Sequence, residues 1–184
     1  QVGTAGDEPI SSGLFQGSTL WLIGASDGLY SVLEQEEADP ELQREPLSSA
    51  AGFLLGYSSS GIVNRAFSLN DDNDQSTETL QGLIGFDGDM VVAGSTTGDF
   101  TGEGVVSGLE QGIVARVSLL PEAETGGEDA GFRNDWRYQL AVDNSAILAL
   151  ENYRDDEIVA LSRTGSDWYV LLFSPEGQLL TPLN

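Results

Sequence analysis

Short runs of apolar residues recur along the chain, and each run leads into a polar turn that closes on glycine. Three of these runs, at residues 20–24, 90–94 and 157–161, begin 70 and 67 positions apart. Self-similarity at a fixed period is typical of repeat architectures. The pattern therefore predicts three copies of one structural unit, with Leu161 in the place of the glycine that ends the other two runs.

Each unit contains short segments rich in Val, Ile, Leu and aromatic residues, bounded by Gly, Asp and Ser. In the second unit these segments are residues 83–86, 90–94, 112–117 and 136–140. Segments of this length and composition predict antiparallel strands joined in a meander. The third unit has only a weak fourth segment, at Leu179 and Leu180. We expect an all-β fold with about three four-stranded antiparallel sheets.

The units differ mainly in the connection between their second and third strands. An insert at residues 29–51 makes this connection longest in the first unit, and the third unit has almost none. In repeat arrays such insertions form loops on one face, often the binding face. The predicted boundaries are 1–69, 70–140 and 141–184.

The charge of the chain limits its partners. Thirty Asp and Glu residues against seven basic residues, with no histidine, give a net charge of −23. This charge opposes binding to nucleic-acid phosphates and to anionic lipids. The longest apolar runs fall well short of the roughly 18 residues that a membrane helix requires. We therefore expect neither a nucleic-acid partner nor membrane insertion.

The side-chain inventory disfavours catalysis. The chain has no His, Cys or Lys, so the usual general bases, thiol nucleophiles and Schiff-base amines are missing, and disulfides are excluded. Two carboxylates about 5 to 10 Å apart would serve a glycosidase, but thirty acids single out no pair. We expect a non-catalytic protein. The alternative is a glycosidase-like hydrolase with a carboxylate pocket at the axis of the repeat array.

An acidic segment between the first two units is a candidate calcium site. Its oxygen-bearing residues at alternating positions are Asp72, Asp74, Ser76 and Glu78. Calcium takes six to eight oxygen ligands from loops of this kind. The segment lacks the glycine and the final acid of an EF-hand loop, so a solvated turn is the alternative interpretation.

Two further groups of residues are candidates for binding a glycan or a protein. Aromatic faces stack on sugars and anchor interfaces, which makes candidates of Trp21, Trp136 and Trp168. Packing in the core is the alternative role for these tryptophans. The long insert adds an acidic group, Glu34, Glu36, Glu37 and Asp39. Its alternative is a surface loop without a partner.

Residues 90–100, 111–117 and 136–140 resemble the bacterial β-propeller repeats called SBBP repeats. Those repeats have a hydrophobic strand ending in Thr-Gly-Ser-Thr, an insert, a strand ending in Ala-Lys and a strand with tryptophan. Arg116 stands here where lysine is common. The resemblance implies a propeller of secreted or cell-surface proteins and brings no catalytic residues.

These observations together predict a propeller-like array that is partial or is completed by other subunits, because a closed propeller has about four to eight blades. The expected function is a structural or binding module of a secreted, cell-surface or filament assembly. Its expected partners are other protein subunits, copies of itself or glycans. A calcium-stabilised adhesive module is a further alternative.

Calcium bound at Asp72 and Asp74 would stabilise the folded chain by mass action. The calcium hypothesis therefore predicts that a chelator lowers the melting temperature and that added calcium restores it. Differential scanning fluorimetry measures this, with magnesium at the same concentration as the control. An unchanged melting temperature would remove calcium from the account.

Overall fold

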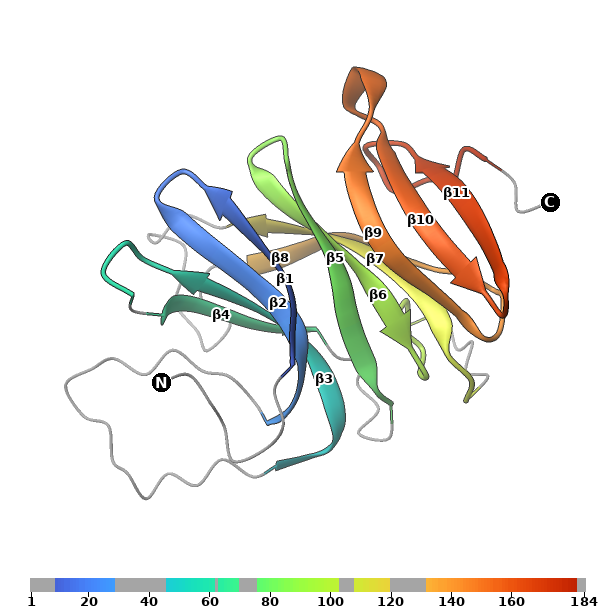
Figure 1. The fold of residues 1–184 in the computed structure, drawn as a ribbon, viewed down its shortest axis with the longest axis horizontal. Coiled ribbons are helices and arrows are strands. Elements are labelled where there is room, and N and C mark those ends of the chain that lie inside the picture. Colours follow the sequence, from blue (N-terminus) through green and yellow to red (C-terminus); the bar gives the residue numbers. More distant parts are fainter. Residues whose placement is uncertain are drawn as a thin grey trace.

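The computed structural model describes residues 9–28, 46–61, 63–69, 76–102, 108–119 and 132–181. Within these residues the chain forms three antiparallel sheets, and the strands of each sheet follow one another in chain order (Figure 1). This arrangement confirms the prediction of an all-β fold built from several antiparallel sheets. No helix in the described part of the chain is long and apolar enough to span a membrane.

The strands have the following bounds. The first sheet contains β1 (Ile10–Gln16), β2 (Thr19–Gly28), β3 (Pro46–Tyr57) and β4 (Val63–Leu69). The second sheet contains β5 (Glu78–Phe86), β6 (Asp89–Thr96), β7 (Gln111–Leu119) and β8 (Phe132–Gln139). The third sheet contains β9 (Ser145–Asn152), β10 (Ile158–Thr164) and β11 (Asp167–Phe173), with the short 3-10 helix η2 (Arg154–Asp156) before β10.

The third sheet has three strands among the described residues, where the sequence predicts four. After β11 the chain makes a single antiparallel bridge, between Phe173 and Leu179. The backbone N–H of Leu180 donates to the carbonyl of Leu172 at 2.7 Å. The N–H of Leu172 donates to the side-chain hydroxyl of Thr181 at 2.9 Å and not to a backbone carbonyl of a fourth strand. The weak segment at the end of the chain is therefore a rudimentary strand.

The predicted insert of the first unit ends earlier than expected. Residues 46–51 belong to β3 and not to a loop, since Pro46 pairs with Gly28 and Ala51 with Ser26. The reason is that β2 continues as far as Gly28 and offers these residues a backbone ladder.

The first hairpin of every sheet carries the same β-bulge. The extra residue on the first strand is Ser11 in β1, Gln81 in β5 and Leu148 in β9. On the second strand, the residues next to the bulge are Ile23, Ala93 and Leu161. Because the bulge fixes the register, it defines which positions of the three sheets are equivalent.

This register corrects the alignment of the third unit. The apolar runs align Leu161 with Gly94, whereas the bulge makes Ser162 the counterpart of Gly94 and Leu161 the counterpart of Ala93. The cause is a longer turn, since η2 places three residues between the paired Tyr153 and Glu157. The turn between β5 and β6 has two. One extra residue moves every side chain of β10 to the opposite face relative to the alignment.

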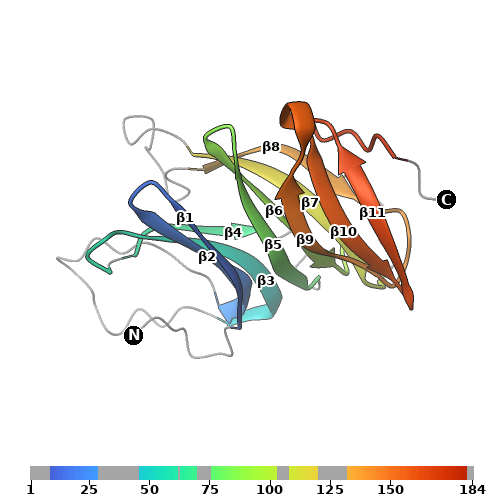
Figure 2. The ribbon, with the colours of Figure 1, turned by 45° about the horizontal axis from the view of Figure 1, so that its top comes forward.

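The three sheets pack side by side with the second in the middle. Their first strands contact one another, because β5 packs on β1 and β9 packs on β5, and both views show β5 between the other two (Figures 1 and 2). The apolar cluster between the first and second sheets includes Trp21, Ile23, Leu54, Leu80, Met90 and Val92. The cluster between the second and third includes Val91, Ala93, Val114, Ile147, Ile158 and Ala160. The side chains of β6 therefore alternate between two cores.

Close approach between the first two sheets requires a glycine at position 52. A Cβ atom added at Gly52 would lie 2.8 Å from Cγ of Leu80. We predict that Gly52→Ala destabilises the fold by about 1–3 kcal/mol through overpacking. Urea denaturation followed by circular dichroism measures the change.

Gly85→Ala is the matched control in another strand, because a Cβ there has its nearest contact at 3.5 Å, with Leu14. This variant should be neutral or more stable by up to about 1 kcal/mol. Equal effects of the two substitutions would show that the sheets do not approach each other at Gly52.

Candidate interaction surfaces

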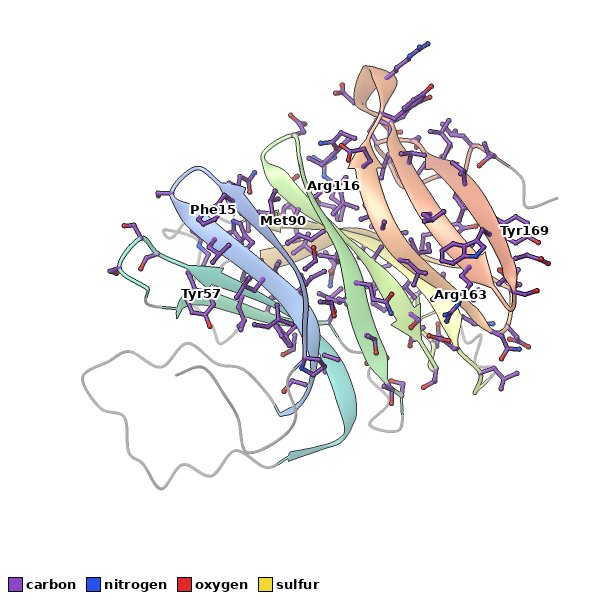
Figure 3. All side chains as sticks on the ribbon, viewed as in Figure 1. Phe15, Tyr57, Met90, Arg116, Arg163 and Tyr169 are labelled. Atoms are coloured by element: carbon purple, nitrogen blue, oxygen red, sulfur yellow. The ribbon has the colours of Figure 1, made fainter. Side chains whose placement is uncertain are left out.

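The row of sheets ends in two apolar sheet faces that no other described sheet covers. Phe15 and Tyr57 mark the face of the first sheet, and Arg163 marks the opposite end of the molecule (Figure 3). We call them the first end face and the third end face. Large exposed apolar side chains occur on both. Such patches on a protein surface mark interaction sites.

The first end face contains a groove of about 570 Å³. Its apolar side chains come from β1, β2 and β3, namely Ile10, Phe15, Leu20, Leu22 and Tyr57. Phe15 is 74% exposed and Ile10 is 59% exposed, while Phe53 and Leu55 in the same sheet are buried. The hairpin turns at Gly17 and Gly61 close one end of the groove.

The third end face is formed by the outward residues of β9, β10 and β11. Alternation along β11 directs Tyr169, Leu171 and Phe173 toward the second sheet. The residues between them point outward, and Trp168 and Val170 are 58% and 68% exposed. Leu161 pairs with Val170 across the ladder, so the two side chains adjoin on this face.

Three apolar positions on each end face have counterparts that are buried in the second sheet. On the first end face, the groove residues and their counterparts in the second sheet are Leu20 and Met90, Leu22 and Val92, and Tyr57 and Val117. On the third end face, the residues and their counterparts are Val159 and Val91, Leu161 and Ala93, and Val170 and Val114. All six counterparts are buried between sheets. The end faces thus have the chemistry of an interface between sheets, with no described sheet against them.

One position differs between the inner faces and the third end face. Gly52 and Gly112 occupy equivalent places in β3 and β7, and a Cβ added at Gly112 would lie 2.8 Å from Leu140 and 3.1 Å from Ile147. The counterpart in β11 is Trp168, which pairs with Arg163. The third end face therefore has a tryptophan at the position where close packing requires glycine on the inner faces.

The three tryptophans lie in different environments. Trp21 is in the core, where its ring packs edge-on against Phe132 with centroids 5.9 Å apart. Trp136 is half-buried on β8 and its Nε1–H donates to the carbonyl of Pro175 at 2.9 Å. Trp136 thus holds the turn after β11 against the second sheet. Trp168 alone among them is exposed.

The candidate calcium ligands are described only in part. Asp72 and Asp74 lie outside the described residues. Ser76 and Glu78 are both buried, and Oε1 of Glu78 accepts a hydrogen bond from the hydroxyl of Thr96 at 2.8 Å. Among the described residues no group of three or more acidic side chains is placed to hold a metal ion. The acidic group of the insert, Glu34, Glu36, Glu37 and Asp39, also lies outside the described residues.

Sequence reasoning missed an ion-pair network on the second sheet. The guanidinium of Arg116 donates two hydrogen bonds to Oδ2 of Asp89, at 2.6 and 2.9 Å. The same group lies 3.7 Å from Asp135 and stacks 5.2 Å from the ring centroid of Phe86. These contacts give Arg116 a structural role. The sequence feature that could have indicated this network is the acidic turn at Asp87 and Asp89, which precedes the strand that neighbours Arg116.

A second network fixes the connection between β6 and β7. The side-chain oxygen of Gln139 accepts from the N–H of Phe100 at 2.8 Å, and its amide nitrogen donates to the carbonyl of Gly98 at 2.8 Å. Arg137 donates to the carbonyl of Phe100 at 3.1 Å and lies over its ring. Phe100 is buried in the cluster between the first two sheets. This part of the connection between β6 and β7 therefore stabilises the packing of the first two sheets.

No protein-family model matches this chain, and no curated protein matches it in sequence. The candidate site therefore stands on the geometry of the two end faces.

The pH dependence of stability tests the ion-pair network. Burial raises the pKa of Asp135, but hydrogen bonds from Ser118 and Arg133 and the charges of Arg133 and Arg116 outweigh it and hold the pKa below 3.8. A depressed pKa in the folded state means that the ionised carboxylate contributes stability above the unfolded pKa, and that this contribution is lost as the pH falls through the folded pKa.

We predict that Asp135→Asn lowers the free energy of unfolding at about pH 6 and that the difference shrinks between about pH 5 and pH 2. Parallel urea titrations of the two proteins measure it. A difference that stays constant with pH would assign the effect of the substitution to packing.

Proposed function

We propose that this chain is a non-catalytic structural module, a propeller-like array of blades that assembles with other β-sheet units through its two end faces. One observation carries the proposal. Six apolar residues of the two end faces, each exposed or half-buried, occupy positions whose counterparts are buried between sheets in the same chain. A surface that repeats the composition of an inner interface is suited to contact another sheet.

The arrangement of the first strands supports the propeller-like part of the proposal. In a propeller the blades are consecutive meanders arranged radially around an axis. Here β5 contacts both β1 and β9, and Asn152 on β9 donates to the backbone carbonyl of Gly85 on β5 at 3.0 Å. The first strands thus lie side by side, as the inner strands of a propeller do, while β4 and β8 are the opposite edge strands of their sheets.

The acidic surface fits an assembly that works through apolar contact and not through bulk charge. A net charge of −23 keeps separate molecules soluble and disfavours unspecific association. The proposed setting is a secreted or cell-surface assembly, with protein subunits as the partners. The hydrolase and the calcium-stabilised adhesive module stay predictions from the sequence, since no observation on the described residues favours either.

Photo-cross-linking in the producing cells tests the proposal. A photoreactive amino acid at position 15 or 170 should give discrete adducts with a protein partner, because both side chains are highly exposed on an end face. Position 153 is the matched control, since Tyr153 is 49% exposed but belongs to a hairpin turn.

The expected result is adducts from positions 15 and 170 and none from position 153. Absence of adducts from both end faces would overturn the proposal, whatever the identity of the partner.

A further inference from the structure

The two end faces of this chain are complementary to each other. We propose that the third end face of one molecule docks onto the first end face of a second copy, in a head-to-tail contact anchored by Trp168 over the groove that begins at Ile10. This inference rests on the proposed function and names the partner as the chain itself. Three observations support it. They are the register of the sheets, the geometry of the two inner interfaces, and the large Trp168 at a position that is glycine on the inner faces.

The inner interfaces give the geometry of the contact. In each interface, the face of one sheet that carries Gly52 or Gly112 packs on the face of the next sheet that carries Leu80 or Ile147. We call the second of these the receiving face. Both interfaces therefore join two different faces and are of the head-to-tail kind. At the first interface the position of Gly52 meets Leu80, and at the second the position of Gly112 meets Ile147. Both Leu80 and Ile147 lie beside the bulge on the first strand of their sheet.

The same rule applied to the ends brings Trp168 together with Ile10. Trp168 is the counterpart of Gly52 and Gly112, and Ile10 is the counterpart of Leu80 and Ile147. Leu80 and Ile147 are fully buried by their interfaces, whereas Ile10 is 59% exposed. A second copy would cover Ile10 as the inner sheets cover its counterparts.

Side-chain size favours a second copy over a further sheet of the inner type. An inner receiving face packs a leucine or isoleucine against a glycine, and there is no space for a larger residue at that contact. Trp168 would collide with such a face at the inner spacing between sheets. The first end face differs, because it has a groove of about 570 Å³ beside Ile10. Trp168 on the third end face of one molecule would therefore meet the groove on the first end face of the other.

The first end face also differs from the inner receiving faces in the middle of its first strand. Gly13 pairs with Leu22 and is the counterpart of Leu83 and Leu150 in the other two sheets. Leu150 packs against the position of Gly82 in the inner interface. The first end face thus lacks the leucine that the inner receiving faces have at this position, and the side chain of Leu22 lies there instead, 2.9 Å from a Cβ added at Gly13.

Electrostatics set the conditions under which the contact forms. Each chain has a net charge of −23, so two copies repel at low ionic strength. Salt shortens the Debye length from about 30 Å at 0.01 M to about 3 Å at 1 M. Association through apolar faces should therefore strengthen as salt is added, whereas association through ion pairs would weaken.

Light scattering coupled to size exclusion tests the contact with three proteins, in about 0.5 M salt where the repulsion is screened. The wild type should exceed 19.5 kDa as the loading concentration rises. Phe15→Asp, which alters only the first end face, and Val170→Asp, which alters only the third, should each run as monomers. Both sites are highly exposed, so both variants should keep the melting temperature of the wild type.

The decisive sample is an equimolar mixture of Phe15→Asp and Val170→Asp. A head-to-tail contact leaves one intact pair of faces in the mixture, so it should give a species of twice 19.5 kDa that neither variant forms alone. If the wild type associates but one of the variants still forms dimers, the contact joins identical faces and the inference is wrong. A wild type that is monomeric at every loading would also overturn it, while adducts with another protein in the cross-linking experiment would leave the proposed function standing.

Trp168→Ala measures the anchor itself. Buried tryptophans at the centre of an interface are typical hot spots, so the dissociation constant should rise roughly 30-fold or more. Tyr153→Ala removes an aromatic side chain of similar exposure outside the contact and should change the dissociation constant by less than about 2-fold. Equal effects of the two substitutions would remove Trp168 from the interface.

Discussion

A β-sheet with apolar side chains on both faces needs a cover on each face, and this requirement governs the whole chain. Hydrogen bonding within each meander satisfies the backbone but leaves the faces open. The second sheet is covered on both sides, and seven of the eight residues of β6 are buried. In β1 and β11, by contrast, buried or half-buried residues alternate with exposed ones. The end sheets are therefore built like the middle sheet but leave one face exposed along β1 and β11, whereas Phe53, Leu54 and Leu55 of β3 are buried on both faces.

Much of the fold could be predicted because strand periodicity and turn chemistry are local. Apolar runs bounded by Gly and Asp indicate the strands, and the spacing between runs indicates three units. The third register could not be predicted in the same way. It depends on the number of residues in one turn, and η2 adds one there. Because side chains alternate with a period of two, this single residue decides whether Leu161 faces the core or the outside.

The exposed end faces were harder to predict than the strands, because burial of a strand residue depends on which sheet lies next to it. All three tryptophans lie in strands with similar neighbours, yet Trp21 is buried and Trp168 is exposed. A signal was present in the third strands, in which Gly52, Gly112 and Trp168 occupy equivalent positions. Its meaning requires the structure, since only the contacts at Gly52 and Gly112 explain why a large residue is excluded from the inner faces.

The central claim is that the exposed apolar face around Trp168 becomes covered by another sheet. The most direct measurement is the fluorescence emission of Trp168, obtained as the difference between the wild type and Trp168→Phe, as the protein is concentrated in high salt. The account predicts a shift to shorter wavelength as the indole leaves water, with a midpoint equal to that of the mass increase. An emission that stays at the wavelength of a solvated indole at every concentration would contradict it.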